Sequence, residues 1–182
     1  MAPSGLWRIK NMTLSLIVPE EVEAVFRYFL TCELSTFSKD GAPVTWPIEP
    51  LYQPEKGQFL LTTSIGLAQK VFNIRRNPNV SLLFSDPTGS GLSDPPAVLV
   101  QGVARASDEV YTEFEGELRE FVNVAFQRQP AAKLYSGNPL TRYLFDWYYM
   151  RLTIHVTPRR ILWWDHADFG FKPNEMEVGY VE

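Results

Sequence analysis

The spacing of apolar residues near the start of the chain is helical. Proline fits the first turn of a helix, and acidic residues suit its positive N-terminus, so Pro19-Glu20-Glu21 is typical of a helix start. The residues that follow Pro19 place one apolar face at helical intervals: Val22, Val25, Phe26 and Phe29. We expect this helix to end near Cys32.

From Glu33 the pattern changes to an alternation of apolar and polar residues, which is the period of a strand. A turn at residues 39–41, Lys-Asp-Gly, predicts a hairpin whose second arm covers residues 43–52. Another turn at 54–57 leads into a strand over 58–63. These segments predict three strands in a meander.

Helical spacing returns at residues 64–76, and this helix must stop before Asn77-Pro78 because proline disfavours a helical residue before it. Strands are expected at 80–84 and 97–106, with a loop rich in Gly, Pro, Ser and Asp between them. The elements expected after these are a helix over 108–129, a turn or helix over 140–147, a strand over 149–157 that Pro158 ends, and a last strand over 161–164. No pattern places the tail, residues 165–182.

Many short antiparallel strands with helices outside them predict a barrel of the α+β class, since closure removes the exposed edges of a sheet. The length of 182 residues fits one domain over residues 1–182, with a helical elaboration at about 107–148 and the tail at 165–182. Hydrophobic residues make up 45% and charged residues 21%, which is typical of an ordered globular protein.

Charge and cysteine content narrow the classes of function. A net charge of -4 argues against a nucleic-acid partner, because such proteins bind phosphate backbones with clustered Lys and Arg. No apolar run is long enough for a signal peptide or a membrane span, so we expect a soluble protein without membrane contact. Cys32 is the one cysteine and cannot form an intramolecular disulfide, which makes the cytoplasm the expected location.

The segment from Leu60 to Pro78 holds the strongest candidate for chemistry. A strand ends in hydroxyl side chains and enters a helix through a glycine, so backbone N–H groups, the helix dipole and the hydroxyls can converge on one anion. Lys70 lies about one turn into this helix. Arg75 and Arg76 either add charge or occupy the solvated last turn. The residue types alone support an anion site and an ordinary strand-to-helix connection equally well.

A combination of motifs resembles the pyridoxamine 5'-phosphate oxidase-like family of flavin-binding split barrels. Its pieces are Asp40-Gly41-Ala42-Pro43 before a strand, the run from Thr62 to Phe84 with Asn-Ile-Arg-Arg-Asn-Pro inside it, and the strand from Val98 to Ala104. The similarity covers about residues 20–106, with a weaker match at 151–164. It implies a six- to seven-stranded antiparallel split β-barrel, mainly β, with peripheral helices.

The resemblance also implies a homodimer with two FMN sites at the subunit interface and a small-molecule substrate. The phosphate would be held by Lys70, Gln69, Thr63 and Ser64. The isoalloxazine ring would lie against Trp46, Pro47 and Ile48 and against Leu61 and Thr62, and Trp164 would come from the partner subunit. Packing at an interface is an equally good interpretation of Trp163 and Trp164.

The chain departs from the oxidase itself at two places. The oxidase has an arginine on the first-hairpin strand where this chain has Trp46, and it has a C-terminal arginine motif for its substrate, whereas no arginine follows Arg160 here. We therefore expect an FMN-dependent oxidoreductase of unknown substrate and leave its catalytic residues unassigned. The alternatives are a reductase that uses the deazaflavin coenzyme, and a non-catalytic protein that binds or senses flavin.

Other candidates for chemistry have little support. His155 and His166 lack Cys or carboxylate partners at metal-ligand spacing, so no metal is expected and His155 is interpreted as packed or interfacial. Cys32 lacks a nearby histidine and is interpreted as a small core residue.

Overall fold

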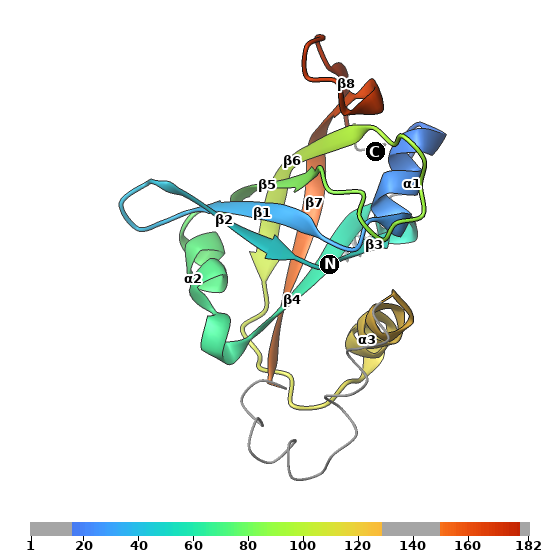
Figure 1. Cartoon of the computed structure of the whole chain (residues 1–182). Coiled ribbons are helices and arrows are strands. Elements are labelled where there is room, and N and C mark those ends of the chain that lie inside the picture. Colours follow the sequence, from blue (N-terminus) through green and yellow to red (C-terminus); the bar gives the residue numbers. More distant parts are fainter. Residues whose placement is uncertain (1–15, 129–149, 179–182) are drawn as a thin grey trace, which may run out of the picture.

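The computed structural model describes residues 16–128 and 150–178 and consists of a strongly curled antiparallel sheet with helices outside it (Figure 1). The strands are β1 (Cys32–Phe37), β2 (Pro43–Ile48), β3 (Pro50–Gln53), β4 (Gln58–Ser64), β5 (Asn79–Phe84), β6 (Ala97–Ala106), β7 (Arg151–Trp164) and β8 (Asn174–Glu177). The helices are α1 (Glu20–Tyr28), α2 (Gln69–Arg76) and α3 (Gly116–Arg128), with short 3-10 turns η1 (Pro54–Lys56), η2 (Ile65–Leu67) and η4 (Asp165–Ala167).

The order of strands explains how the sheet closes. It runs β2-β1-β5-β6-β7-β4-β3, with β8 paired to β7. The two end strands of this path, β2 and β3, are consecutive in the chain, and only Glu49 lies between them. The chain itself therefore joins the two ends of the sheet, which confirms the predicted mainly β, antiparallel split barrel with peripheral helices. Within the described residues, seven strands lie on this path, in agreement with the six to seven predicted, and β8, which was not predicted, pairs with β7 beside it.

Expected elements differ from the observed ones at several boundaries. Residues 43–52 are not one strand in a three-stranded meander, since the bend at Glu49 sends β2 and β3 to opposite ends of the sheet. Helix α1 ends at Tyr28 rather than near Cys32, because Phe29 is extended and Cys32 already pairs with Ile48. Ser64 belongs to β4, so the α-helix expected from Ser64 begins only at Gln69.

The helix expected over 108–129 begins at Gly116. Tyr111 forms backbone hydrogen bonds in both directions with Arg151, which hold this stretch against β7 in an extended form. The turn or helix expected at 140–147 lies outside the described residues, as do parts of the elaboration at 107–148 and of the tail at 165–182. The described part of the tail forms η4 and β8.

Pro158 does not end the seventh strand, which continues without a break from Arg151 to Trp164. The register explains this correction: Gln101 pairs with Arg160 and Gly102 pairs with Pro158, so Arg159 is an extra residue in a bulge. Proline lacks the N–H that a regular ladder needs and is therefore tolerated at bulges.

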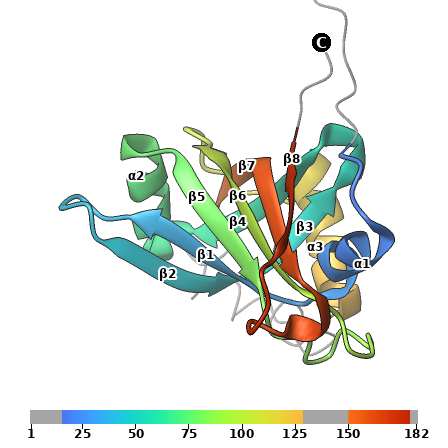
Figure 2. The ribbon, with the colours of Figure 1, turned by 90° about the horizontal axis from the view of Figure 1, so that it is seen from above.

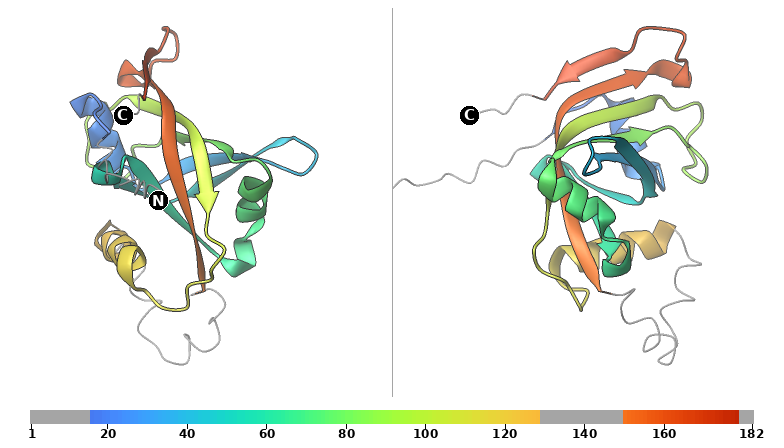
Figure 3. Two further views of the ribbon diagram at one scale, coloured as in Figure 1. Left: turned by 180° about the vertical axis from the view of Figure 1, so that it is seen from behind. Right: turned by 90° about the vertical axis from the view of Figure 1, so that its left-hand side faces the viewer.

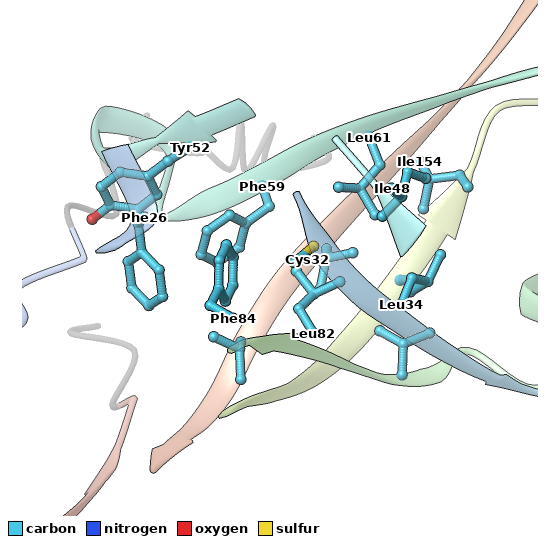
Figure 4. Close-up of a cluster of buried hydrophobic side chains, with 14 of the residues drawn as sticks. Phe26, Cys32, Leu34, Ile48, Tyr52, Phe59, Leu61, Leu82, Phe84 and Ile154 are labelled. Atoms are coloured by element: carbon cyan, nitrogen blue, oxygen red, sulfur yellow. The ribbon is translucent and has the colours of Figure 1, made fainter. Parts of the chain in front are cut away.

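The core fills the barrel with side chains from α1 and from every strand around it. Figure 4 shows two parts: an aromatic group and an aliphatic group that includes Leu34, Leu61 and Ile154. The rings of the aromatic group pack closely, and Phe26 and Phe59 meet edge to face with their centroids 4.9 Å apart. This group consists of Phe26, Tyr52, Phe59 and Phe84. Phe26 thus anchors α1 to one end of the barrel, because aromatic pairs combine a large buried area with favourable ring geometry.

The helices lie on different sides of the barrel. Helix α2 lies opposite α1 and α3 in both the front and back views, and the β1–β2 hairpin extends beside it, away from the barrel (Figures 1, 2 and 3). Helix α3 covers the outer face of the sheet, where Phe121 packs on Leu51 and Leu60. Polar contacts fix its two ends: Glu117 binds His155, and Arg128 donates to the carbonyls of Pro50 and Arg27.

We expect Glu117→Ala to lower the free energy of unfolding by about 1 kcal/mol, since it removes a partly buried hydrogen-bonded pair. Glu117 Oε1 lies 2.9 Å from His155 Nε2, and Glu117 Oε2 lies 3.7 Å from Lys56 Nζ. Urea unfolding measures the change. Glu120→Ala on the exposed face of α3 is the matched control. Equal losses in the two variants would contradict this role for Glu117.

No helix among residues 16–128 and 150–178 is long and apolar enough to cross a membrane.

Candidate functional site

The strand-to-helix connection after β4 forms a compact polar structure. The Ser64 hydroxyl accepts a hydrogen bond of 3.2 Å from the backbone N–H of Gly66, which caps the short turn η2. Helix α2 then begins at Gln69 and ends at Arg76, where Asn77 is extended, as the following proline requires. The turn sets the position of α2 relative to the end of β4 and so determines where Lys70 lies.

Lys70 is the second residue of α2, and it is buried, with 7% of its surface exposed. Its ammonium donates hydrogen bonds of 3.1 Å to Thr63 Oγ1 and 3.1 Å to the carbonyl oxygen of Leu67. Its Nζ lies 5.4 Å from the centroid of the Trp46 ring, within the range of a cation–π contact. Three sequence-predicted site residues, Trp46, Thr63 and Lys70, therefore lie together.

The electrostatics of Lys70 are unusual because its partners are neutral. No carboxylate of the described residues forms an ion pair with it, and burial alone lowers the pKa of its ammonium. A buried charge is normally paired, because leaving water costs several kcal/mol. The site therefore has one positive charge that an anion could neutralise, and two hydrogen-bonding partners that the anion could share or replace.

Helix α2 holds a second polar centre that sequence reasoning missed. Asn73 is fully buried, and its Nδ2 donates a 3.0 Å hydrogen bond to Thr36 Oγ1 on β1. Its Oδ1 accepts hydrogen bonds from Gln69 Nε2 and Arg76 Nη2. The available signal was an asparagine one helical turn after Lys70 on the same face, among the apolar positions of the helix.

The remaining charged and polar residues of α2 point elsewhere. Arg75 donates to the carbonyl oxygen of Ser107 and lies 3.4 Å from Asp108. Arg76 and Gln69 both bind Asn73. Of the candidate cations on this helix, only Lys70 lies at the Thr63 hydroxyl.

The predicted ring-contact residues divide between the two faces of the sheet. Ile48 and Leu61 point into the barrel core with Trp46 on the same side of β2 as Ile48. Pro47 is exposed on the opposite face of β2. Alternation along β4 likewise places Thr62 on the face opposite Leu61, so the predicted set does not form one continuous surface within the chain.

The outer face beside Thr62 is polar. Thr62 pairs with Thr153 on β7. The hydroxyl of Thr153 is buried and has no hydrogen-bond partner within the described parts of the chain. Glu49, two residues after Pro47, is partly buried, and desolvation raises the pKa of its carboxyl while Arg128 and Arg151 oppose that rise. This surface offers hydroxyl and charged groups between the end of α3 and the start of β7.

Trp164 lies far from Lys70 within one chain. Ser64 at the end of β4 pairs with Arg151, the first residue of β7, whereas Trp164 is the last residue of that strand. At about 3.3 Å per residue the two ends of β7 are about 40 Å apart. Trp164 packs against Phe169 with ring centroids 5.2 Å apart and lines a shallow pocket with residues of the tail: Asp165, His166, Asp168, Phe171, Lys172 and Asn174.

The contacts of the remaining candidates, Cys32, His155 and His166, fit structural roles. Cys32 is fully buried, and burial raises the pKa of its thiol, which keeps the thiol protonated and unreactive. His155 binds Glu117, and His166 binds Asp94. Within residues 16–128 and 150–178, no group of three or more His, Cys, Asp and Glu side chains could hold a metal ion.

Comparisons with known proteins agree with this architecture. Residues 18–137, well over half of the chain, match the family described as pyridoxamine 5'-phosphate oxidase. No curated protein matches the sequence. Solved structures with the same fold include a protein from Clostridium acetobutylicum related to general stress protein 26, of the pyridoxinephosphate oxidase family, at 13% identity and a TM-score of 0.56, covering 87% of this chain and 92% of that one.

Two further solved structures share the fold and belong to proteins with other names. An F420 reductase is 22% identical with a TM-score of 0.54, and the match covers 79% of this chain and 98% of that one. A heme-binding protein from Mycobacterium smegmatis is 18% identical with a TM-score of 0.54, covering 90% of this chain and 60% of that one. At these identities the structures support the fold, while the sequence match over residues 18–137 establishes the family. The chain belongs to the pyridoxamine 5'-phosphate oxidase family.

Proposed function

We propose that this chain binds FMN through a phosphate contact at Lys70 and acts as a flavin-dependent oxidoreductase. The observation that supports this most directly is the buried Lys70 ammonium, whose partners Thr63 and Leu67 are neutral acceptors. An anionic ligand would compensate the charge that the described residues leave unpaired. Phosphate fits especially well, because it accepts several charge-assisted hydrogen bonds at once.

The residues around Lys70 suit a phosphate that carries an aromatic group. The Thr63 hydroxyl now donates to the Leu67 carbonyl at 3.1 Å, and it can donate to a phosphate oxygen in place of that carbonyl. The half-buried ring of Trp46 lies beside the ammonium and limits the access of water. Bound FMN would supply hydride or electron transfer, while the protein would bind and orient it.

We also propose that the functional unit is a homodimer. Trp164 and Lys70 lie at opposite ends of the long strand β7, so one chain cannot bring both to one cofactor. A second copy could supply the tryptophan, as the family resemblance implies. A monomer measured by light scattering at micromolar concentration would contradict the dimer without affecting the Lys70 site.

The absorbance of the purified protein tests the choice of cofactor. FMN predicts a yellow protein with a band near about 450 nm, and mass analysis of the released ligand identifies it. The deazaflavin coenzyme is the second candidate, because a structural neighbour at 22% identity is named an F420 reductase. A colourless protein that binds added deazaflavin but not FMN would favour that coenzyme and contradict the FMN proposal.

Reduction of the bound flavin separates an enzyme from a binding protein. Mixing the loaded protein with NADH or NADPH should bleach the flavin band, and an added acceptor should restore it. A flavin that binds at Lys70 and stays oxidised with both donors would favour a non-catalytic role in binding or sensing.

A further inference from the structure

Two polar cross-links attach α2 to the barrel. Lys70 Nζ binds Thr63 at the end of β4, and Asn73 Nδ2 binds Thr36 on β1. Lys70 and Asn73 are three residues apart, which places them on one face of the helix. The two links therefore hold neighbouring turns of the same helix face to two different strands.

The Asn73 amide has a single orientation. Arginine has no acceptor, so the atom of Asn73 that faces the Arg76 guanidinium must be the oxygen Oδ1. The amide nitrogen then faces Thr36, whose hydroxyl accepts its hydrogen bond at 3.0 Å. Asn73 and Thr36 are 0% and 1% exposed, so water does not compete for this bond. A buried and satisfied hydrogen bond of this kind fixes geometry, because breaking it would leave a polar group unpaired.

The two links respond differently to an anion. A phosphate that binds Lys70 competes with Thr63 and the Leu67 carbonyl for the ammonium protons, which weakens the attachment of α2 to β4. The Asn73–Thr36 bond involves no atom of the anion site and stays intact. Helix α2 can therefore keep its place on the sheet while Lys70 changes partners.

We propose that Asn73, anchored on Thr36, is the positioning residue of the Lys70 anion site. This inference rests on the proposed function, since it takes the phosphate of FMN as the ligand of Lys70. Asn73 does not contact the ligand. It holds α2 so that the Lys70 ammonium remains beside Thr63 and Trp46.

The test compares a ligand with a phosphate and one without. Thr36→Val keeps the shape of the side chain and removes the acceptor of Asn73. It should weaken FMN binding about fivefold to tenfold, because α2 is no longer anchored and the Lys70 ammonium loses part of its charge-assisted hydrogen bonding to the phosphate. The affinity for riboflavin, which lacks the phosphate, should stay within about twofold, and Thr36→Ser should restore FMN binding. Thr36→Ala removes the same acceptor and replaces the valine variant if that variant does not fold.

A Lys70→Met background separates this inference from the proposed function. With Lys70→Met present, Thr36→Val should cause no additional loss of FMN affinity, because the group that Asn73 positions is gone. Equal losses for FMN and riboflavin, or an unchanged loss in the Lys70→Met background, would overturn the positioning role. If Lys70→Met alone leaves FMN affinity unchanged, the proposed phosphate site fails. If Lys70→Met weakens binding and Thr36→Val does not, only the positioning role fails.

Discussion

Replacement of Lys70 by methionine is expected to weaken FMN binding by about 10- to 100-fold, which corresponds to the loss of about 1.5–3 kcal/mol from a hydrogen bond to a charged group. The reason is that Lys70 is the only cation of α2 beside the Thr63 hydroxyl, since Arg75 and Arg76 bind Ser107 and Asn73. Titration of the apoprotein by flavin fluorescence measures the affinity. The affinity for riboflavin should fall far less, because riboflavin carries no phosphate.

The same variant should not destabilise the apoprotein. Methionine has nearly the shape of the lysine stem, and it removes a buried ammonium that has only neutral partners. A buried charge without an ionic partner carries a desolvation cost, which the methionine variant no longer has. We therefore expect the free energy of unfolding in urea to be unchanged or raised while FMN affinity falls.

Lys39→Met is the matched control for Lys70→Met. Lys39 is exposed in the turn between β1 and β2, so its replacement makes the same change in net charge without touching the site. Its FMN affinity should remain that of the parent protein. Similar losses of affinity in the two variants would mean that overall charge, and not the Lys70 contact, attracts the cofactor.

The pH dependence of binding gives a further check on Lys70. Burial lowers the pKa of its ammonium, and a bound phosphate raises that pKa because the complex favours the charged form. FMN affinity should thus be complete below the pKa of the free site and fall as pH rises toward the pKa of the complex. The fall should begin below the ordinary lysine value of about 10.4 and should be absent in Lys70→Met.

Gly102→Ala is expected to lower the free energy of unfolding by about 3 kcal/mol, at the upper end of the usual cost of overpacking. A Cβ atom at Gly102 would lie 2.4 Å from the carbonyl oxygen of Thr157 and 3.3 Å from Cα of Pro158. Both atoms belong to the backbone of β7 and cannot move aside as a flexible side chain could. Two central strands would have to separate at the bulge.

Thermal or urea unfolding measures the effect of Gly102→Ala. Gln101→Ala is the matched control, because Gln101 is exposed in the preceding position of β6 and its change should stay within about 0.5 kcal/mol. A Gly102→Ala variant as stable as the parent would show that β6 and β7 can move apart at the bulge without cost.

Local sequence signals predicted most of the elements and failed where distant segments decide the outcome. The strand at 97–106 and the strand at 58–63 were predicted correctly within a residue, because alternation along each strand reflects one buried face. Pro158 was misjudged, since its tolerance depends on a bulge opposite Gly102 in another strand. No local pattern contains the identity of that partner.

The candidate site was predicted in part for the same reason. The sequence predicted a lysine-bearing helix after two threonines and a serine, and the structure places the Lys70 ammonium at Thr63. Lys70 is the second residue of α2 rather than one turn into it, because the helix begins only at Gln69. The contact with Trp46 and the anchor between Asn73 and Thr36 join residues far apart in the chain. Both depend on the curvature of the sheet, which brings β1, β2 and the end of β4 under one helix.

By itself, the sequence determined the class of fold, the family and the lysine-bearing helix after β4, because each follows from local periodicity, turn residues and ordered motifs. Tertiary structure alone decided that β2 and β3 close the barrel through Glu49, and that Pro47 and Thr62 lie on the face opposite Ile48 and Leu61. It also left Lys70 buried with neutral partners. Burial and pairing are properties of surfaces that meet only when the chain folds, so no single segment contains them.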